Sequence, residues 1–242
     1  ALGEQGALPA RYTIVDVSGS LRERQRATLA AHAARVHWAD RLAGRFEGVV
    51  LGNEVLDAMP VQLIARTGGV WHERGVTEAA DGRLAWADRP TALRPPLDIE
   101  GPHDYLTEVH PQAEAFVRTL AERWTRGAGF FIDYGFPEAE YYHPQRHMGT
   151  LICHRAHRSD DDPLADPGLK DITAHVNFTG IALAAQDAGL AVLGYTGQGR
   201  FLINAGLLDV AQGAGPRERA MLGKLVNEHE MGELFKVLAL AP

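Results

Sequence analysis

The fold is decided by VVLGNEVLDAMPV, residues 49–61. An apolar run of strand length ends at Gly52. The amide of Asn53 and the carboxylate of Glu54 follow, and Asp57 comes three residues later. Open α/β sheets present reactive groups in this way at the carboxyl edge of a strand. A buried strand followed by a helix cap, with Asn53 capping and Asp57 in solvent, explains the same residues, so the neighbouring segments must decide.

An earlier segment repeats the pattern of a strand that ends on an acidic residue. Residues 11–17 are β-branched and aromatic and close on Asp16, and a helical pattern follows over 21–32. Asp16 is placed to accept hydrogen bonds from the two hydroxyls of a ribose, although capping of the next helix would also explain it. Residues 34–38 form a weak strand and 46–51 a strong one. A helix between successive strands predicts a parallel sheet, so residues 1–60 form its first half.

Residues 61–105 show a different pattern. Two turn signals, at 67–69 and 81–82, separate runs rich in β-branched and aromatic residues. This pattern predicts an antiparallel β insertion that covers the edge of the sheet or the mouth of a site.

Residues 106–242 return to alternating helices and strands and predict the second half of the sheet. An amphipathic helix over 112–126 leads into an apolar strand over 128–135, and this strand ends on Asp133. Because Glu54 also follows a strand, we expect the two carboxylates to face one crevice.

Residues 137–170 are irregular and rich in His, Asp and Pro, which predicts a lid-like loop. Four histidines in this segment raise a metal hypothesis: His143, His147, His154 and His157. Pro144 interrupts the helical spacing of the first two, and no spacing matches a known zinc pattern. We therefore expect no metal site.

The composition limits the classes of protein. The chain has 242 residues, of which 45% are hydrophobic, so it can bury a large core. A net charge of -7 argues against nucleic acid as a partner. The single cysteine, Cys153, excludes an internal disulfide and a four-thiolate zinc site, which fits a reducing compartment. Since no apolar run approaches the length of a bilayer span, we expect a soluble protein without membrane insertion.

Several segments match one family in its order. They are residues 14–18 with 21–25, 53–61, 132–135, 162–168, 171–176 and 235–238. Together they resemble the MidA family of S-adenosylmethionine-dependent methyltransferases, which includes a mitochondrial complex I assembly factor. The resemblance covers nearly the whole chain.

The resemblance implies a class I methyltransferase fold, which is α/β, seven-stranded and Rossmann-like, with S-adenosylmethionine as cofactor. The implied cofactor-binding residues are Asp16, Ser18, His37, Trp38 and Asn53. Asp16 would hold the ribose, while His37 and Trp38, after the third strand, would lie near the adenine.

The implied substrate is a protein arginine, on a complex I subunit in the mitochondrial member. Carboxylates bind a guanidinium bidentately and can orient one nitrogen toward the methyl group. Glu54 is the first candidate for this role, followed by Asp133 and Asp57, while Asn53 would orient the target nitrogen. His175 would accept the released proton, although a histidine before a helix is commonly structural.

One departure from the family matters. Its glycine-rich first strand and loop would lie upstream of residue 1, so we expect a fold that lacks this strand, depends on the missing N-terminal segment of the same protein and alone binds cofactor weakly. A non-catalytic assembly factor with the same fold and, more remotely, a metal-dependent hydrolase are alternatives. We expect a cytoplasmic protein if it is bacterial and a mitochondrial matrix protein if it is eukaryotic. The oligomeric state and a small-molecule substrate stay open.

Overall fold

The first unit, Ala1–Phe46, is a strand-helix-strand motif in the computed structural model, which describes residues 3, 6–42, 44–156 and 158–242. Its elements are β1 (Tyr12–Val15), α1 (Gly19–Thr28), η1 (Ala30–His32) and β2 (Val36–Ala39). The strands β1 and β2 pair in parallel, with Thr13 opposite His37. Ser18 caps α1, because its hydroxyl accepts a hydrogen bond from the Leu21 N–H at 3.4 Å. The predicted parallel pairing is confirmed.

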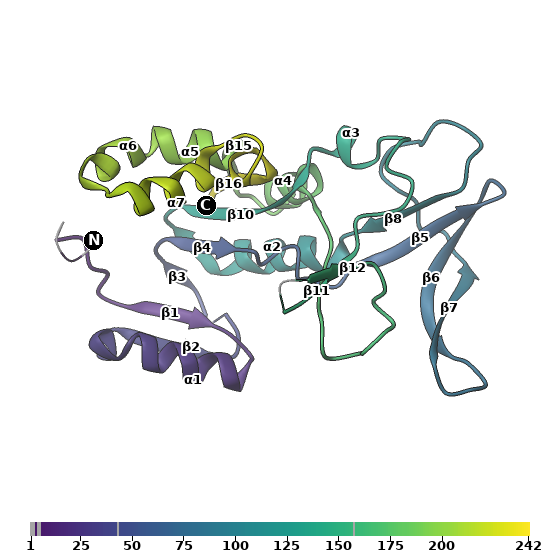
Figure 1. Ribbon diagram of the computed structural model, residues 1–242, viewed down its shortest axis with the longest axis horizontal. Coiled ribbons are helices and arrows are strands. Elements are labelled where there is room, and N and C mark those ends of the chain that lie inside the picture. The colour runs from purple at the N-terminus through teal and green to yellow at the C-terminus, as the bar shows by residue number, and fades with distance from the viewer. Residues whose placement is uncertain (1–2, 4–5, 43, 157) are drawn as a thin grey trace. The chain divides into compact units, whose positions relative to one another are not determined.

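The second unit, Glu47–Pro242, contains a mixed sheet. Its strands are β4 (Val50–Asn53), β10 (Gly129–Phe136), β14 (Val176–Asn177), β15 (Ala191–Gly197) and β16 (Phe235–Ala241). Strand β10 pairs in parallel with β4 and with β14, and antiparallel with β16. Strand β15 continues the sheet antiparallel to β16. Strand β4 lies along the first half of β10 (Figure 1), and its last residue, Asn53, is opposite Ile132. The next residue of β10, Asp133, therefore reaches the turn that follows β4.

The predicted strand over 46–51 is in fact two strands, β3 (Phe46–Glu47) and β4. Gly48 separates them with φ +149, a backbone conformation that favours glycine. Its N–H donates to the Arg126 carbonyl at 2.9 Å. The prediction of one continuous strand was wrong, because an apolar run does not reveal a backbone turn at a single glycine.

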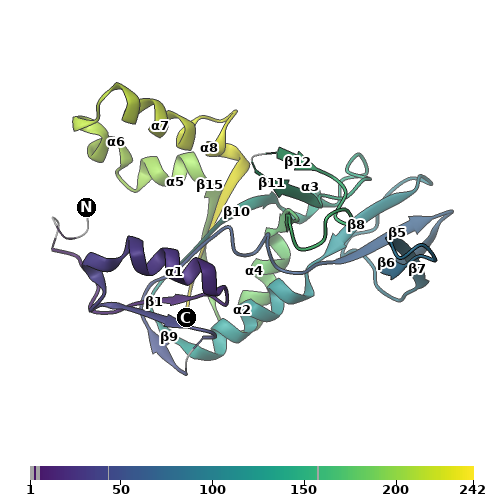
Figure 2. The ribbon, with the colours of Figure 1, turned by 60° about the horizontal axis from the view of Figure 1, so that its bottom comes forward.

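Two helices pack against each other beside the sheet, α2 (Pro111–Arg123) and α4 (Phe178–Asp187) (Figure 2). Helix α2 buries Val117 and Leu120 completely, and α4 buries Ile181. The prediction extended α2 to residue 126, but Trp124 is already extended and opens the short strand β9 (Trp124–Arg126).

Residues 62–109 form a separate antiparallel sheet in the order β7-β6-β5-β8. Its strands are β5 (Gln62–Thr67), β6 (Val70–Glu78), β7 (Leu84–Pro90) and β8 (Tyr105–Val109). It lies at one end of the second unit, while the C-terminal helices lie at the other end (Figure 1). The hairpins predicted within 61–105 are present, but β8 carries the sheet past that boundary.

Residues 137–170 are more regular than the predicted irregular loop. They contain α3 (Glu138–Tyr141), β11 (Ile152–Arg155) and β12 (Arg158–Asp160), and β13 (Asp171–Thr173) joins the two strands in a small sheet. Cys153, on the central strand of this sheet, is fully buried. The His- and Asp-rich composition concealed these short strands.

The chain between β15 and β16 is helical. Its helices are α5 (Gln198–Asn204), α6 (Leu207–Val210), η2 (Ala211–Gly213), α7 (Pro216–Val226) and α8 (Met231–Leu234). Gly206, with φ +92, separates α5 from α6. No helix in the described part of the chain is long and apolar enough to cross a membrane.

Candidate functional site

The turn after β4 is fixed by one carboxylate. Asp133 Oδ2 accepts three consecutive backbone N–H bonds, from Val55 at 3.1 Å, Leu56 at 2.9 Å and Asp57 at 3.2 Å. Successive N–H groups that converge on one anion form a nest. The nest follows directly on Glu54, whose φ of 50 is a strained conformation for a residue with a side chain. The three bonds to Asp133 therefore fix the backbone of residues 55–57, and this turn holds Glu54 in its left-handed conformation.

Asp57 and Asp133 form a buried acidic pair beneath this turn, each with less than 5% of its surface exposed. Burial, followed by the charge of Glu54, raises the pKa of Asp57 to about 6. Burial, followed by the charge of Asp57, raises the pKa of Asp133 to about 7. Among the described residues, Asp57 Oδ1 has no hydrogen-bond partner. The pair is therefore poised to hold a proton near neutral pH.

Glu54 is the exposed carboxylate of the group. Asn53 Nδ2 donates to its Oε1 at 3.2 Å, and the Tyr134 hydroxyl lies 3.5 Å from its Oε2. Burial, followed by the charge of Glu54, raises the pKa of Tyr134 to about 12, so this hydroxyl keeps its proton. Glu54 is the carboxylate that a ligand in solution can reach.

His175 lies next to the same turn, because the Ala174 N–H donates to the Asp57 carbonyl at 3.0 Å. Its ring centroid is 5.1 Å from that of Phe136 and 6.4 Å from that of Tyr134. Its Nδ1 is buried and has no partner among the described residues. Burial lowers the pKa of His175, which favours the neutral ring that can accept a proton.

In the first unit, Asp16 follows β1 and is ionised. Its carboxylate accepts hydrogen bonds from the Ser18 N–H and from Gln25 Nε2, both at 2.8 Å, and these bonds hold the pKa of Asp16 below its usual value. Gln25 Oε1 in turn accepts from Trp38 Nε1 at 2.8 Å. A carboxylate of this kind fits the hydroxyl donors of a ribose.

His37 and Trp38 lie within β2, and not after it as expected. The His37 ring bonds through Nδ1 to the Val36 carbonyl at 3.0 Å. Asp40 is the residue that follows β2, and it lies 2.5 Å from the guanidinium of Arg22. Sequence reasoning proposed neither Asp40 nor Gln25 for the site, although an acidic residue after a strand was a signal available for Asp40.

The structure thus brings together the five residues proposed for the second unit, Asn53, Glu54, Asp57, Asp133 and His175. In the first unit, Gln25 links Asp16 with Trp38, and Ser18 bonds to Asp16.

Metal ligands do not cluster in the part of the chain that the structure describes: no three His, Cys, Asp or Glu side chains there could hold one ion. His157 lies outside the described residues.

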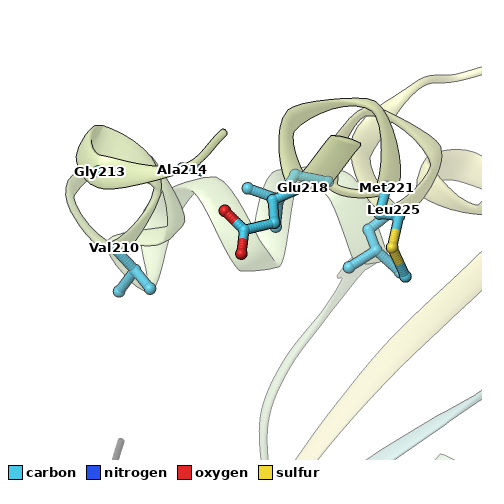
Figure 3. A pocket seen from close by; sticks show the side chains of 7 residues that line it. Val210, Gly213, Ala214, Glu218, Met221 and Leu225 are labelled. Carbon is cyan, nitrogen blue, oxygen red and sulfur yellow. The ribbon is translucent and has the colours of Figure 1, made fainter. Parts of the chain in front are cut away.

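A hollow of about 510 Å³ lies away from these carboxylates, against α7. Figure 3 shows Glu218 between Val210 on one side and Met221 and Leu225 on the other. Its lining is otherwise apolar, and Glu218 is the single charged residue in it. With one carboxylate and an otherwise apolar lining, the hollow lacks the cluster of acidic groups found at the turn after β4.

Parallel strand pairs, with acidic residues at or after the ends of β1 and β4, are typical of Rossmann-like α/β folds. Residues 4–196 match the family described as "Putative S-adenosyl-L-methionine-dependent methyltransferase", and the chain belongs to this family. The expected membership and the family cofactor, S-adenosylmethionine, are confirmed.

The chain is similar to a solved structure and to curated proteins. A likely methyltransferase from Burkholderia thailandensis, whose crystal structure was solved bound to S-adenosyl-homocysteine, is 50% identical to this chain in sequence. The two structures superpose with a TM-score of 0.92, and the match covers 100% of this chain and 66% of that one. Protein arginine methyltransferase NDUFAF7, mitochondrial, of Homo sapiens is 30% identical over 79% of this chain and 45% of that protein. The homologue of Caenorhabditis elegans is 27% identical over 80% and 47%. The chain spans about half the length of these curated relatives.

Proposed function

We propose that the protein containing this chain transfers a methyl group from S-adenosylmethionine to an arginine of a protein substrate. Family membership supports the cofactor and the type of reaction. The names of the human and nematode relatives support arginine as the acceptor.

The observation that carries the proposal is the conformation and exposure of Glu54. This residue is held with φ 50 by the nest on Asp133, and its carboxylate is exposed at the end of β4. A planar carboxylate can accept two parallel hydrogen bonds from a guanidinium, which orients a third nitrogen. Asn53 and Tyr134 fix the rotation of the carboxylate.

The remaining residues take supporting roles. When bound, S-adenosylmethionine supplies an electrophilic methyl group on a sulfonium. Asp16, assisted by Ser18, would accept hydrogen bonds from the ribose hydroxyls, and His37 and Trp38 stay proposed as neighbours of the adenine. The attacking guanidinium nitrogen must lose a proton, and the neutral ring of His175 is our candidate acceptor.

Asp133 and Asp57 act differently from Glu54 in this proposal. Asp133 uses one oxygen to hold three backbone N–H groups, and both acids are buried. They position Glu54 and adjust the charge beneath it, and the direct contact with substrate falls to Glu54.

Radioactive methyl transfer to an arginine-rich peptide by the complete protein tests the proposal. Glu54→Gln keeps the size and loses the charge, so we expect activity to fall roughly 100-fold or more, as for other transition-state contacts. Glu78→Gln, at an exposed acid of β6, is the matched control and should retain full activity. Cofactor binding without any transfer would instead favour an assembly factor, and transfer only to small molecules would overturn the protein substrate.

The location and the target protein are also proposals. The curated relatives are named mitochondrial, which supports the mitochondrial matrix for a eukaryotic source. A complex I subunit as target and the cytoplasm for a bacterial source stay predictions.

A further inference from the structure

Glu108, on β8, is a buried carboxylate that the proposed mechanism does not use. It is completely buried, and four neutral groups donate to it. The donors to Oε1 are the Thr150 N–H at 2.8 Å and the Leu151 N–H at 3.2 Å. The donors to Oε2 are the Tyr141 hydroxyl at 2.8 Å and the Thr150 hydroxyl at 3.2 Å. A buried carboxylate does not by itself stabilise a fold, so the role of Glu108 follows from the residues that it holds in place.

Glu108 holds the segment 143–151 against β8. The Leu106 N–H donates to the His147 carbonyl at 2.9 Å, and the Tyr105 hydroxyl donates to the His143 carbonyl at 3.0 Å. A Cβ atom on Gly149 would lie 2.6 Å from Glu108 Oε1, which shows how closely the segment approaches the carboxylate. Hydrogen bonds thus hold residues 143–151 along β8, with Thr150 near the end of this segment.

Thr150 connects this carboxylate to the candidate site. Its single hydroxyl hydrogen goes to Glu108 at 3.2 Å or to the Tyr141 hydroxyl at 3.1 Å, so in either case its oxygen is free to accept the His175 N–H at 3.0 Å. The preceding amide, of Ala174, donates to the Asp57 carbonyl. Two consecutive backbone amides are therefore fixed: that of Ala174 by the turn at the site, and that of His175 by Thr150, which Glu108 holds.

The bond from Tyr141 sets the direction of the next bond. The Tyr141 hydroxyl donates to Glu108 Oε2 at 2.8 Å, so its single hydrogen is used there. His110 Nε2, 3.1 Å from the Tyr141 oxygen, must then carry a hydrogen and donate. Burial lowers the pKa of His110 to about 4, so this ring is neutral at pH 7 and adds no compensating charge.

We propose that Glu108 and Thr150 are positioning residues that fix the backbone of His175, and with it the ring beside Tyr134. This inference rests on the proposed function for its catalytic consequence. Other groups that face the His175 ring are Phe136, through ring contact, and Arg146, through its charge.

The test compares Thr150→Val with Thr150→Ser in the complete protein. Valine keeps the shape and removes the hydroxyl, while serine retains it. We expect Thr150→Val to lower kcat roughly tenfold or more, because small displacements of reacting groups are costly, with the KM for S-adenosylmethionine changed less than about twofold. Thr150→Ser should recover most of the loss, and Glu108→Gln should resemble Thr150→Val.

A second measurement does not depend on turnover. The imidazole nitrogen signals of His175, in protein labelled with ¹⁵N-histidine and assigned with a His175→Gln sample, should shift in Thr150→Val and return in Thr150→Ser. Wild-type kcat together with unchanged His175 signals in Thr150→Val would overturn the inference. If the wild-type protein transfers no methyl group, the proposed function fails, while the His175 signals still decide the positioning.

Discussion

Asp57 and Asp133 lie side by side but make different hydrogen bonds. One oxygen of Asp133 binds three backbone N–H groups, whereas Asp57 Oδ1 has no partner among the described residues. The N–H bonds favour the charged form of Asp133, and burial with the neighbouring charge opposes it more strongly. Ionisation of both groups in the folded state therefore lowers the free energy of unfolding.

This cost predicts how stability depends on pH. The folded pKa of each acid is raised from 3.8, so the folded state retains protons that the unfolded chain releases between about pH 4 and pH 7. The free energy of unfolding should therefore fall as the pH rises through this range. Asp57→Asn removes one of the two titrating groups and should reduce the total decline by roughly 3 kcal/mol, measured by urea unfolding at several pH values.

Asp161→Asn, at an exposed acid, is the control for this experiment and should leave the slope unchanged. An equal slope in Asp57→Asn and wild type would contradict the raised pKa of Asp57.

At the scale of elements, the junction of β10 with β14 depends on Gly135. This glycine has φ +159 and lies opposite Val176 in the parallel pair. A Cβ atom there would lie 2.1 Å from the Val176 carbonyl oxygen, so Gly135→Ala must separate the two strands. We expect a loss of about 3 kcal/mol in unfolding free energy, measured by chemical denaturation.

Gly194→Ala is the matched control, because a Cβ atom there meets nothing within 4 Å. It should change stability by less than about 0.5 kcal/mol. If Gly135→Ala proved equally mild, the close approach of the two strands would be wrong.

The elements that the sequence predicted best are those with a strong period or a clear stop. The strand before Asp16, the strand that contains Asp133 and the helix that begins at Pro111 could be predicted, because local pattern agrees with the observed element there. Short strands such as β11 could not, because their pairing partners are distant and their polar residues carry no alternation. The nest on Asp133 was likewise hidden, since it joins residues 76 to 78 positions apart.

At the scale of the whole molecule, the two units differ in how much they bury. In the described part of Ala1–Phe46, Val36 is the single buried apolar residue, and α1 buries none. The second unit holds the remainder of the buried apolar residues, including Phe131 and Leu238 in its sheet. Local stability follows buried apolar contacts, so the units should open independently.

Hydrogen exchange measured by mass spectrometry on the 242-residue chain tests this difference. Amides of β1 and β2 should exchange roughly 100-fold faster than amides of β10 and β16, because a local opening exposes little apolar surface. Equal protection in both units would contradict the expectation.

The left-handed backbone at Glu54 lowers the stability of the fold, whereas its side chain serves the activity that we propose. Glycine adopts φ 50 without strain, so Glu54→Gly should raise the free energy of unfolding by up to about 1 kcal/mol, whereas Glu54→Gln should not, because it keeps the strain. Both variants lose the carboxylate that we propose binds the guanidinium. Glycine would be the more stable residue at this position, and the proposed reaction gives a reason for a carboxylate there in its place.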